Sequence, residues 1–252
     1  MEALANPDCG WFYRAEASGF FAIPGCTIAY WATRAMRELF KASRPAKEYA
    51  QFKHGMSTGK NEAVLRIWSE VDFSKIKFDS KSHDDLYQSG RRFVPYNKGG
   101  EFRRWWGNQA YIIGYDRAYD SLMDTFSGHR HDNKATYFMP NVSWSKVSSG
   151  ALAMRFFPQG FVYDVAGCSV FSEEANLLPI LAVFNTNLCL KCMEFMSPTL
   201  NFEVGTLESF PIKNEIFNDN RIVRLVKESI VAAKKDWDSY EESWAFRHHP
   251  LV

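Results

Sequence analysis

The 252-residue chain has little net charge, few cysteines and no long apolar run. Its formal net charge is +1, so any affinity for nucleic acid must come from a local concentration of basic residues. Five cysteines without paired spacing argue against a disulfide scaffold and for a reducing compartment. The most apolar region, 177–190, is interrupted by Pro179, Asn185 and Asn187, and the N-terminus lacks a signal-peptide pattern. We therefore expect a cytoplasmic protein that does not enter a membrane.

The composition is that of a folded protein. Apolar residues make up 46% of the chain and aromatic residues 16%, which argues against disorder. At this length the chain can form one large domain or two small ones.

Short runs typical of β-strands occupy the middle of the chain. Residues 64–71 alternate, and 111–113 are aromatic and β-branched. Residues 154–157 and 161–165 flank Pro158-Gln159-Gly160, and a three-residue connection containing glycine predicts a hairpin. The polar stretch 116–134 shows neither periodicity, so we expect a long surface loop there.

Helical patterns flank these strands. Thr27 is a candidate N-cap for a helix whose one face would carry Ile28, Trp31, Ala35 and Leu39. Two apolar helices are predicted at 177–184 and 188–195, the second capped by Thr186 or Asn187, and an amphipathic helix runs from 222 to 238. The chain is therefore predicted to be α+β, with a twisted mixed sheet and flanking helices.

Basic residues are concentrated in residues 88–106. Five basic residues stand against Glu101 alone, a net +4, namely Arg91, Arg92, Lys98, Arg103 and Arg104. Such side chains neutralise phosphates and, as Arg forks, discriminate guanine edges. Asn97 and Trp105 complete the candidate contacts in this segment, and Gly99-Gly100 would let backbone amides approach a phosphate. The alternative is a solvated basic turn with its tryptophans buried.

The sequence GMSTGKN at 55–61 predicts a tight loop that opens a sheet. Its spacing is wrong for a phosphate-binding P-loop, because three residues separate the glycines and Asn61 replaces the hydroxyl residue. Ser57, Thr58, Lys60 and Asn61 are candidate donors to phosphates or base edges. A purely structural turn is the equal alternative.

Other reactive residues are interpreted as structural. Cys189 and Cys192 lie in a predicted apolar helix without a second ligand pair, so we expect core packing. His129, His131 and Asp132 stand in a polar stretch and are interpreted as solvated surface. Asp164, Glu203 and Glu208 are interpreted as scaffold, in the segments 161–171 and 197–212. No metal site and no catalytic residue are predicted.

Four segments stand in a fixed order along the chain, and a fifth string, YFMPNVSWSKVSSG at 137–150, lies between the second and the third. They are GMSTGKN at 55–61, PYNKGGEFRRWW at 95–106, FVYDVAGCSVF at 161–171 and SPTLNFEVGTLESFPI at 197–212. Together they resemble the target-recognition region of adenine-specific DNA methyltransferases of the BREX phage-defence (PglX) family, which is related to type IIG restriction-methylation enzymes. The resemblance extends from 19–40 to 234–251.

The resemblance implies a piece of a larger enzyme. It implies a helical linker at 1–50, a DNA target-recognition domain at 51–214 and a helical connector at 215–252. S-adenosylmethionine is expected in a separate catalytic domain and no cofactor in this chain, because no Gly-x-Gly loop follows a strand. Asn6-Pro7-Asp8-Cys9 lacks the second proline and the aromatic ring of the Asn-Pro-Pro-Tyr/Phe tetrapeptide that holds a flipped adenine.

The implied partners are duplex DNA, a methyltransferase catalytic domain or subunit, and other defence-system proteins. The implied function is sequence-specific recognition of duplex DNA for adenine-N6 methylation. One alternative is a protein-interaction module that binds a methyltransferase or another defence subunit without DNA. Another is an inactive remnant of an interrupted gene.

Overall fold

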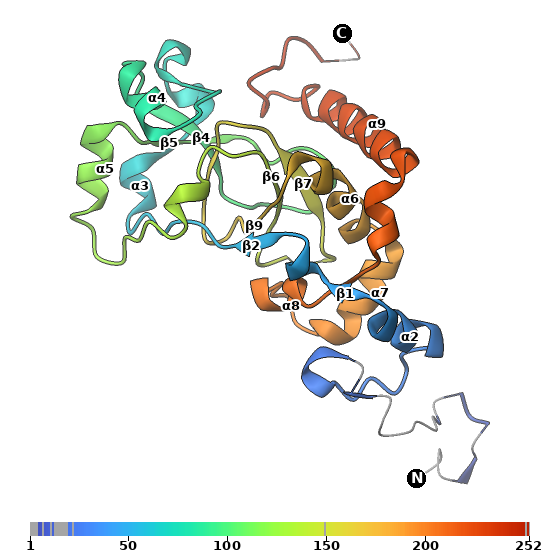
Figure 1. Cartoon of the computed structure of the whole chain (residues 1–252). Helices are drawn as coiled ribbons and strands as arrows, with labels where there is room; N and C mark the ends of the chain where they lie inside the picture. The colour runs from blue at the N-terminus through green and yellow to red at the C-terminus, as the bar shows by residue number, and fades with distance from the viewer. Residues whose placement is uncertain are drawn as a thin grey trace.

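The protein is described by a computed structural model, and its fold is α+β, as predicted (Figure 1). The structure describes residues 5–6, 8–10, 12, 20–21, 23–148, 150–249 and 251. Part of the predicted 1–50 linker, including Pro7 of the tetrapeptide, lies outside the described residues. So do Gly19 and Ala22, Ser149, and Pro250, which belong to segments that carry the resemblance.

One lobe contains a mixed four-stranded sheet, the kind of sheet that the sequence predicts. Its strand order is β3-β5-β4-β8, with β3 (Leu65–Ile67), β4 (Phe93–Asn97), β5 (Tyr111–Gly114) and β8 (Val162–Tyr163). All pairs are antiparallel except β4 with β8. The helices of this lobe are α3 (Asn61–Val64), α4 (His83–Gln88) and α5 (Arg117–Met123).

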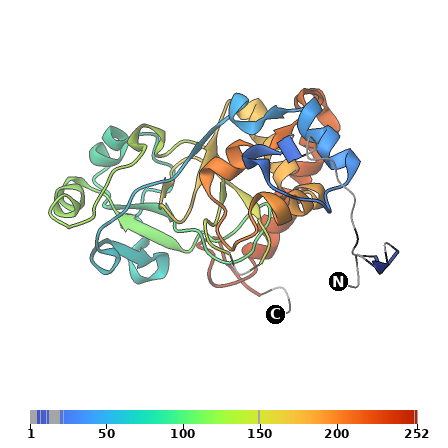
Figure 2. The same cartoon turned by 90° about the horizontal axis from the view of Figure 1, so that it is seen from below.

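The second lobe is built on an antiparallel sheet, so the described strands are divided among several sheets. The strand order is β2-β9-β6-β7, with β2 (Gln51–Lys53), β6 (Asn141–Trp144), β7 (Met154–Phe157) and β9 (Ser169–Phe171). Helix α6 (Glu174–Phe184) contacts β6 and β7, and α9 (Asn220–Trp237) contacts α6. Figure 2 shows the two lobes beside each other from below.

The second lobe also contains a third sheet, which has two strands. It pairs β1 (Arg44–Pro45) with β10 (Pro211–Ile212), near α2 (Arg34–Ala42), α7 (Asn187–Met196) and α8 (Val204–Glu208). The 3-10 helices are η2 (Pro24–Cys26), η3 (Ala46–Glu48), η4 (Trp68–Glu70), η5 (Phe73–Lys75), η6 (Lys134–Thr136) and η7 (Asn214–Asn218). Because β1 pairs with β10, the two ends of the predicted 51–214 region lie close together.

The predicted apolar helices are confirmed. Thr186 caps α7, because its hydroxyl accepts a hydrogen bond from the Cys189 amide at 3.1 Å. Cys189 and Cys192 are both buried in the core, and burial raises the pKa of the Cys192 thiol to about 11. Among the described residues, no single helix is long and apolar enough to cross a membrane, although α6 and α7 together, bent by 73°, satisfy length and composition.

The predicted cap at Thr27 is wrong. Helix α2 begins further along the chain, where the hydroxyl of Thr33 accepts a hydrogen bond from the Met36 amide at 3.2 Å. The helix therefore packs Met36 and Phe40 on the core, in place of the predicted Ala35 and Leu39. Ile28 lies before the helix and is 69% exposed.

The predicted hairpin at 154–165 is also wrong. Strand β7 pairs with β6 in the antiparallel sheet, whereas β8 pairs with β4 in the mixed sheet. The glycine turn between them redirects the chain from one sheet to the other, because Gly160 has a φ of +110° and packs directly on the Phe78 carbonyl. The Phe138 amide donates to the Phe161 carbonyl, and the Gly160 amide donates to the Phe138 carbonyl.

Two other predicted elements need correction. The 116–134 stretch contains α5, capped by Asp116, whose carboxylate accepts from the Tyr119 amide at 2.9 Å. The helix was not predicted because its residues are mostly polar, and Met123 is its one fully buried residue. The 64–71 strand is shortened to β3, because the Glu70 carboxylate accepts from the Ile67 amide at 2.8 Å and turns the chain into η4.

The segment after α9 packs across the lobe of the mixed sheet. The Trp244 ring lies 5.0 Å from the Phe78 ring and 6.0 Å from the Phe161 ring, between centroids. The Trp68 indole donates to the Glu242 carbonyl at 2.9 Å. Because α9 itself packs on α6, this segment connects the two lobes (Figure 1).

Replacing Gly160 by alanine is expected to reduce the free energy of unfolding by about 2–4 kcal/mol. An added Cβ would lie 2.1 Å from the Phe78 carbonyl oxygen at a φ of +110°. Gly205→Ala is the matched control, because Gly205 lies in α8 with open space around it, and it should stabilise by about 0.5–1 kcal/mol. Urea denaturation measures both, and equal effects would contradict this account of the turn.

Candidate nucleic-acid interface

Strand β4 joins the segments that stand in fixed order along the sequence. At its end, the fully buried Asn97 donates from Nδ2 to the Ser143 hydroxyl at 2.6 Å and to the Gly167 carbonyl at 3.2 Å. Its Oδ1 accepts from the Gly99 amide at 3.1 Å. Three of the segments therefore meet around one side chain.

The last of the segments is attached through β6. The Trp144 indole donates to the Phe202 carbonyl at 2.8 Å, and the Phe202 amide donates to the Lys146 carbonyl at 2.7 Å. Lys146 also pairs with Glu203 at 3.1 Å. Segments that are weak as isolated motifs are thus parts of one packed unit.

The 55–61 loop lies against the residues that follow β8. The Met56 amide donates to the Tyr163 carbonyl at 2.9 Å, and the Val165 amide donates to the Met56 carbonyl at 2.9 Å. Gly55 is required for this close approach, because a Cβ there would lie 1.9 Å from the Tyr163 carbonyl oxygen. The predicted tight loop is present, and it leads through α3 into β3 of the mixed sheet.

Asp164 is a buried carboxylate at the base of this loop. It accepts from the Tyr96 hydroxyl at 2.7 Å and from the Ala166 amide at 2.8 Å. The ammonium of Lys98 lies 3.6 Å from its Oδ2. Burial, and then the Asp164 charge, raise the pKa of Tyr96 well above its usual range, so this phenol remains a donor.

A small polar cavity of about 180 Å³ opens between the loop and Lys98. Its lining residues are Ser57, Thr58, Gly59, Asn61, Lys98, Asp164 and Val165. Thr58 is buried and donates to Asn61 Oδ1 at 2.6 Å, whereas Asn61 is exposed at the rim. Lys60 is exposed on the same loop but does not line the cavity. The structure therefore brings together candidates from two separate segments of the sequence.

The other basic candidates lie elsewhere. Arg92 pairs with Asp116 at 2.8 Å, at the N-cap of α5, and Arg91 donates to the Ile76 carbonyl at 3.0 Å. Arg103 pairs with Asp236 of α9 at 3.3 Å and lies 4.9 Å from the Trp237 ring. The basic segment is therefore not one continuous surface.

Several candidates are used inside the fold. Asn97 is fully buried, and Trp105 packs against the core while its amide donates to the Met154 carbonyl. The Arg104 guanidinium lies 5.3 Å from the Phe102 ring, and its Nε is buried without a hydrogen-bond partner among the described residues. The Gly99 amide is already bonded to Asn97. We assign Asn97 and Trp105 to the scaffold that supports the cavity.

Arg155 is a buried cation for which the sequence carries no signal. Its guanidinium donates to the Ser145 hydroxyl at 2.9 Å, and that hydroxyl donates to the Gly100 carbonyl at 2.6 Å. Complete burial lowers the pKa of Arg155 to about 10, and the group remains charged near neutral pH. It supports the Gly99-Gly100 turn from beneath.

Asp164→Ala should reduce the free energy of unfolding by about 2–4 kcal/mol, because it leaves the buried Tyr96 hydroxyl without its acceptor. Glu203→Ala removes the partner of Lys146 at the surface and should cost less than about 1 kcal/mol. Chemical denaturation compares the two variants. An Asp164→Ala cost as small as that of the control would show that the carboxylate does not support the loop.

No family model matches the chain. The adenine-specific methyltransferase PglX of Lacticaseibacillus casei strain Zhang is 34% identical over 261 aligned residues, covering 100% of this chain and 21% of that protein. The adenine-specific methyltransferase BrxX of Escherichia coli O9:H4 strain HS is 34% identical over 244 residues, covering 96% of this chain and 19% of that protein. The chain thus spans about a fifth of the length of these relatives. It is a homologue of one part of the adenine-specific methyltransferases PglX and BrxX.

Proposed function

We propose that this chain recognises a short sequence of duplex DNA for an adenine-N6 methyltransferase of a BREX phage-defence system. The observation that carries the proposal is homology of the whole chain to one part of two adenine-specific methyltransferases. A methyltransferase that acts at chosen adenines needs a part that reads the surrounding bases. The sequence motifs for catalysis are missing from this chain.

The proposed DNA contacts are centred on the cavity between the 55–61 loop and Lys98. Its rim presents hydroxyl, amide and ammonium groups, which can donate to phosphates and to base edges. The groups beneath the rim are held by buried hydrogen bonds of Asp164 and Asn97. Pre-positioned donors lose little conformational freedom on binding, which favours selective contacts. Arg91, Arg92 and Arg103, which lie outside the cavity, would extend the contacts to phosphates.

The residues of this cavity do not fit S-adenosylmethionine. They include no aromatic ring that could stack on its adenine, and both Lys98 and Asp164 are engaged with each other. We place the cofactor, and the methyl transfer, in the remainder of a methyltransferase. This chain would position that remainder on DNA.

Lys60→Ala should weaken binding to all duplexes and reduce the slope of log affinity against log salt by about one. Lys60 is exposed at the end of the loop, where an ammonium can reach a phosphate. Lys227→Ala is the matched control, an exposed lysine on α9, and should leave affinity and slope unchanged. Fluorescence anisotropy with a pool of labelled duplexes at two salt concentrations provides the measurement. Equal behaviour of the two variants would refute the assigned interface.

A second candidate function is binding to the remainder of the methyltransferase. Large apolar side chains are exposed before α2, where Ile28 is 69% and Trp31 is 44% exposed. The chain also spans only about a fifth of its relatives' length. The exposed side chains of Ile28 and Trp31 would therefore pack against another part of the same enzyme.

Changing both Ile28 and Trp31 to serine should therefore weaken association with the remaining four-fifths of the Lacticaseibacillus casei relative while leaving DNA affinity unchanged. Size-exclusion chromatography of the mixture measures the association. Tyr240→Ser alters an exposed aromatic residue outside this patch and is the control. Association that survives the double change would contradict the assignment.

A further inference from the structure

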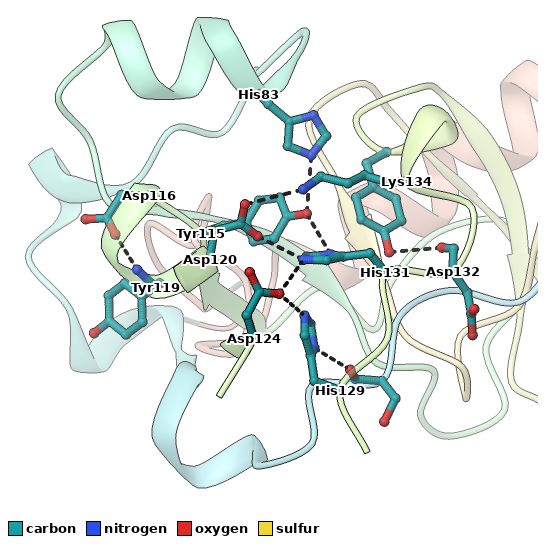
Figure 3. A network of polar contacts seen from close by, with 12 residues as sticks. His83, Tyr115, Asp116, Tyr119, Asp120, Asp124, His129, His131, Asp132 and Lys134 are labelled. Atoms are coloured by element: carbon teal, nitrogen blue, oxygen red, sulfur yellow. Dashed lines mark hydrogen bonds and ion pairs between the residues drawn. The ribbon is translucent and has the colours of Figure 1, made fainter. Parts of the chain in front are cut away.

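Two histidines and an aspartate converge next to the 55–61 loop. Asp124 is the C-cap residue of α5, and His129 and His131 lie on the segment that follows. One ligand atom of each residue lies within 4.8 Å of those of the other two (Figure 3). None of these three residues lines the cavity with Lys98, and the arrangement does not rest on the proposed DNA recognition.

The His129 ring is oriented by a backbone contact. Its Nδ1 lies 2.8 Å from the Ser57 carbonyl oxygen, and only a protonated nitrogen can bond to that acceptor. Neutral His129 therefore presents an unprotonated Nε2 at its other edge. A backbone carbonyl that fixes the ring in this way is usual for a metal-binding histidine.

Nε2 of His129 is a buried atom without a hydrogen-bond partner among the described residues, on a side chain that is 5% exposed. The nearest carboxylate oxygen, Oδ1 of Asp124, is 3.6 Å away. This separation is too long for a hydrogen bond, so a proton on Nε2 would not join the two atoms. The unshared electron pair of Nε2 and the negative carboxylate repel each other at this distance. A cation between the two atoms would remove this repulsion.

His131 faces the same point from the other side. Its Nε2 lies 3.8 Å from Oδ1 of Asp124 and 3.0 Å from Oδ1 of Asp120. Its Nδ1 contacts the Tyr115 hydroxyl at 3.3 Å, which holds the ring from behind. Oδ1 of Asp120 is itself buried, and its 3.0 Å separation from Nε2 of His131 is within hydrogen-bond reach.

Asp120 is positioned by groups outside the cluster. Its other oxygen, Oδ2, accepts from the Tyr87 hydroxyl at 3.1 Å and from the Lys134 ammonium at 3.3 Å. Oδ1 is therefore directed towards Nε2 of His131 (Figure 3). Hydrogen bonds that orient such carboxylates are typical of the groups that surround a metal.

We propose that Asp124, His129 and His131 bind Zn²⁺, with Oδ1 of Asp120 as the adjacent fourth group. Two imidazole nitrogens and a carboxylate form a ligand set that zinc uses in proteins, whereas Ca²⁺ and Mg²⁺ prefer oxygen ligands alone. Tetrahedral zinc with bonds near 2.0 Å separates its ligand atoms by about 3.3 Å. The separations of 3.6 and 3.8 Å approach this geometry after small side-chain movements.

The structural consequence concerns the 55–61 loop. Between the two histidines, the Arg130 amide donates to the Ser57 carbonyl at 2.9 Å, and the Ser57 amide donates to the Arg130 carbonyl at 3.1 Å. A metal bound to both histidines would therefore connect the end of α5 to this loop. The role assigned to the ion is to brace the loop.

Asp132, the acid next to His131 in the sequence, is not part of the cluster. Its carboxylate pairs with Arg130 at 3.2 Å and with His54 at 3.6 Å. Asp124 precedes both histidines in the sequence and is brought to them by the turn after α5. His129 is also buried, so the expectation that these histidines are solvated surface is wrong for this residue.

Zinc titration of the full chain, without a polyhistidine tag and after treatment with a chelator, tests the site. Competition with a chromophoric chelator should show one Zn²⁺ per chain with a dissociation constant of about 1 μM or below. Co²⁺ in its place should give the visible absorption of a tetrahedral ion. Binding of less than one equivalent at tens of micromolar zinc would overturn the proposal.

Variants identify the ligands. His129→Ala and His131→Ala should each weaken zinc binding at least about tenfold. His54→Ala is the matched control, because among the described residues His54 forms an ion pair with Asp132 and not with a proposed ligand. The zinc affinity of this variant should equal that of the unchanged chain. Asp124→Asn keeps the test independent of folding, because this side chain is 67% exposed.

Asp124→Asn should leave the unfolding midpoint of the metal-free chain unchanged while weakening zinc binding at least about tenfold. Zinc should also raise the midpoint of the unchanged chain and not that of the variant. Unchanged zinc affinity in His129→Ala or Asp124→Asn would overturn the assignment of ligands. DNA binding plays no part in these readouts, so failure here leaves the proposed function untouched.

Discussion

The arrangement of the two lobes depends on the hydrogen bonds of the buried Asn97 side chain. Asn97 ends β4 of the mixed sheet, and its amide donates to Ser143 on β6 of the antiparallel sheet. Its backbone carbonyl accepts from the Asp164 amide at 2.9 Å. One residue therefore sets the separation of the sheets and the position of the carboxylate below the 55–61 loop. A buried polar group of this kind is costly unless every partner is present, so it specifies a single arrangement.

Sequence patterns predicted well the elements that can be recognised from their own apolar residues and caps. Helix α6 is mostly apolar, and α7 buries an apolar side and has a recognisable cap in Thr186. The 154–165 segment was predicted wrongly because its two strands have the composition of a hairpin but find partners far away in the sequence. The choice between neighbours and distant partners depends on the Gly160 turn and its contact with Phe78, which no local pattern shows.

The candidate site shows the same division. Residue chemistry identified the 55–61 loop and Lys98 separately, but their meeting at one cavity follows from the parallel pairing of β4 with β8. The basic residues of 88–106 are concentrated in one segment of the sequence, yet Arg92 and Arg103 pair with acids of different helices. Charge counted along a sequence does not say which neighbours a fold supplies.

The central claim is that this chain determines which DNA sequence is methylated. The most direct test replaces the homologous part of the Lacticaseibacillus casei and Escherichia coli relatives with this chain and maps methylated adenines by sequencing, once the two parents are known to methylate different sequences. The account predicts that both active chimeras methylate one and the same sequence. Two active chimeras that each retain the sequence of their own parent would contradict it.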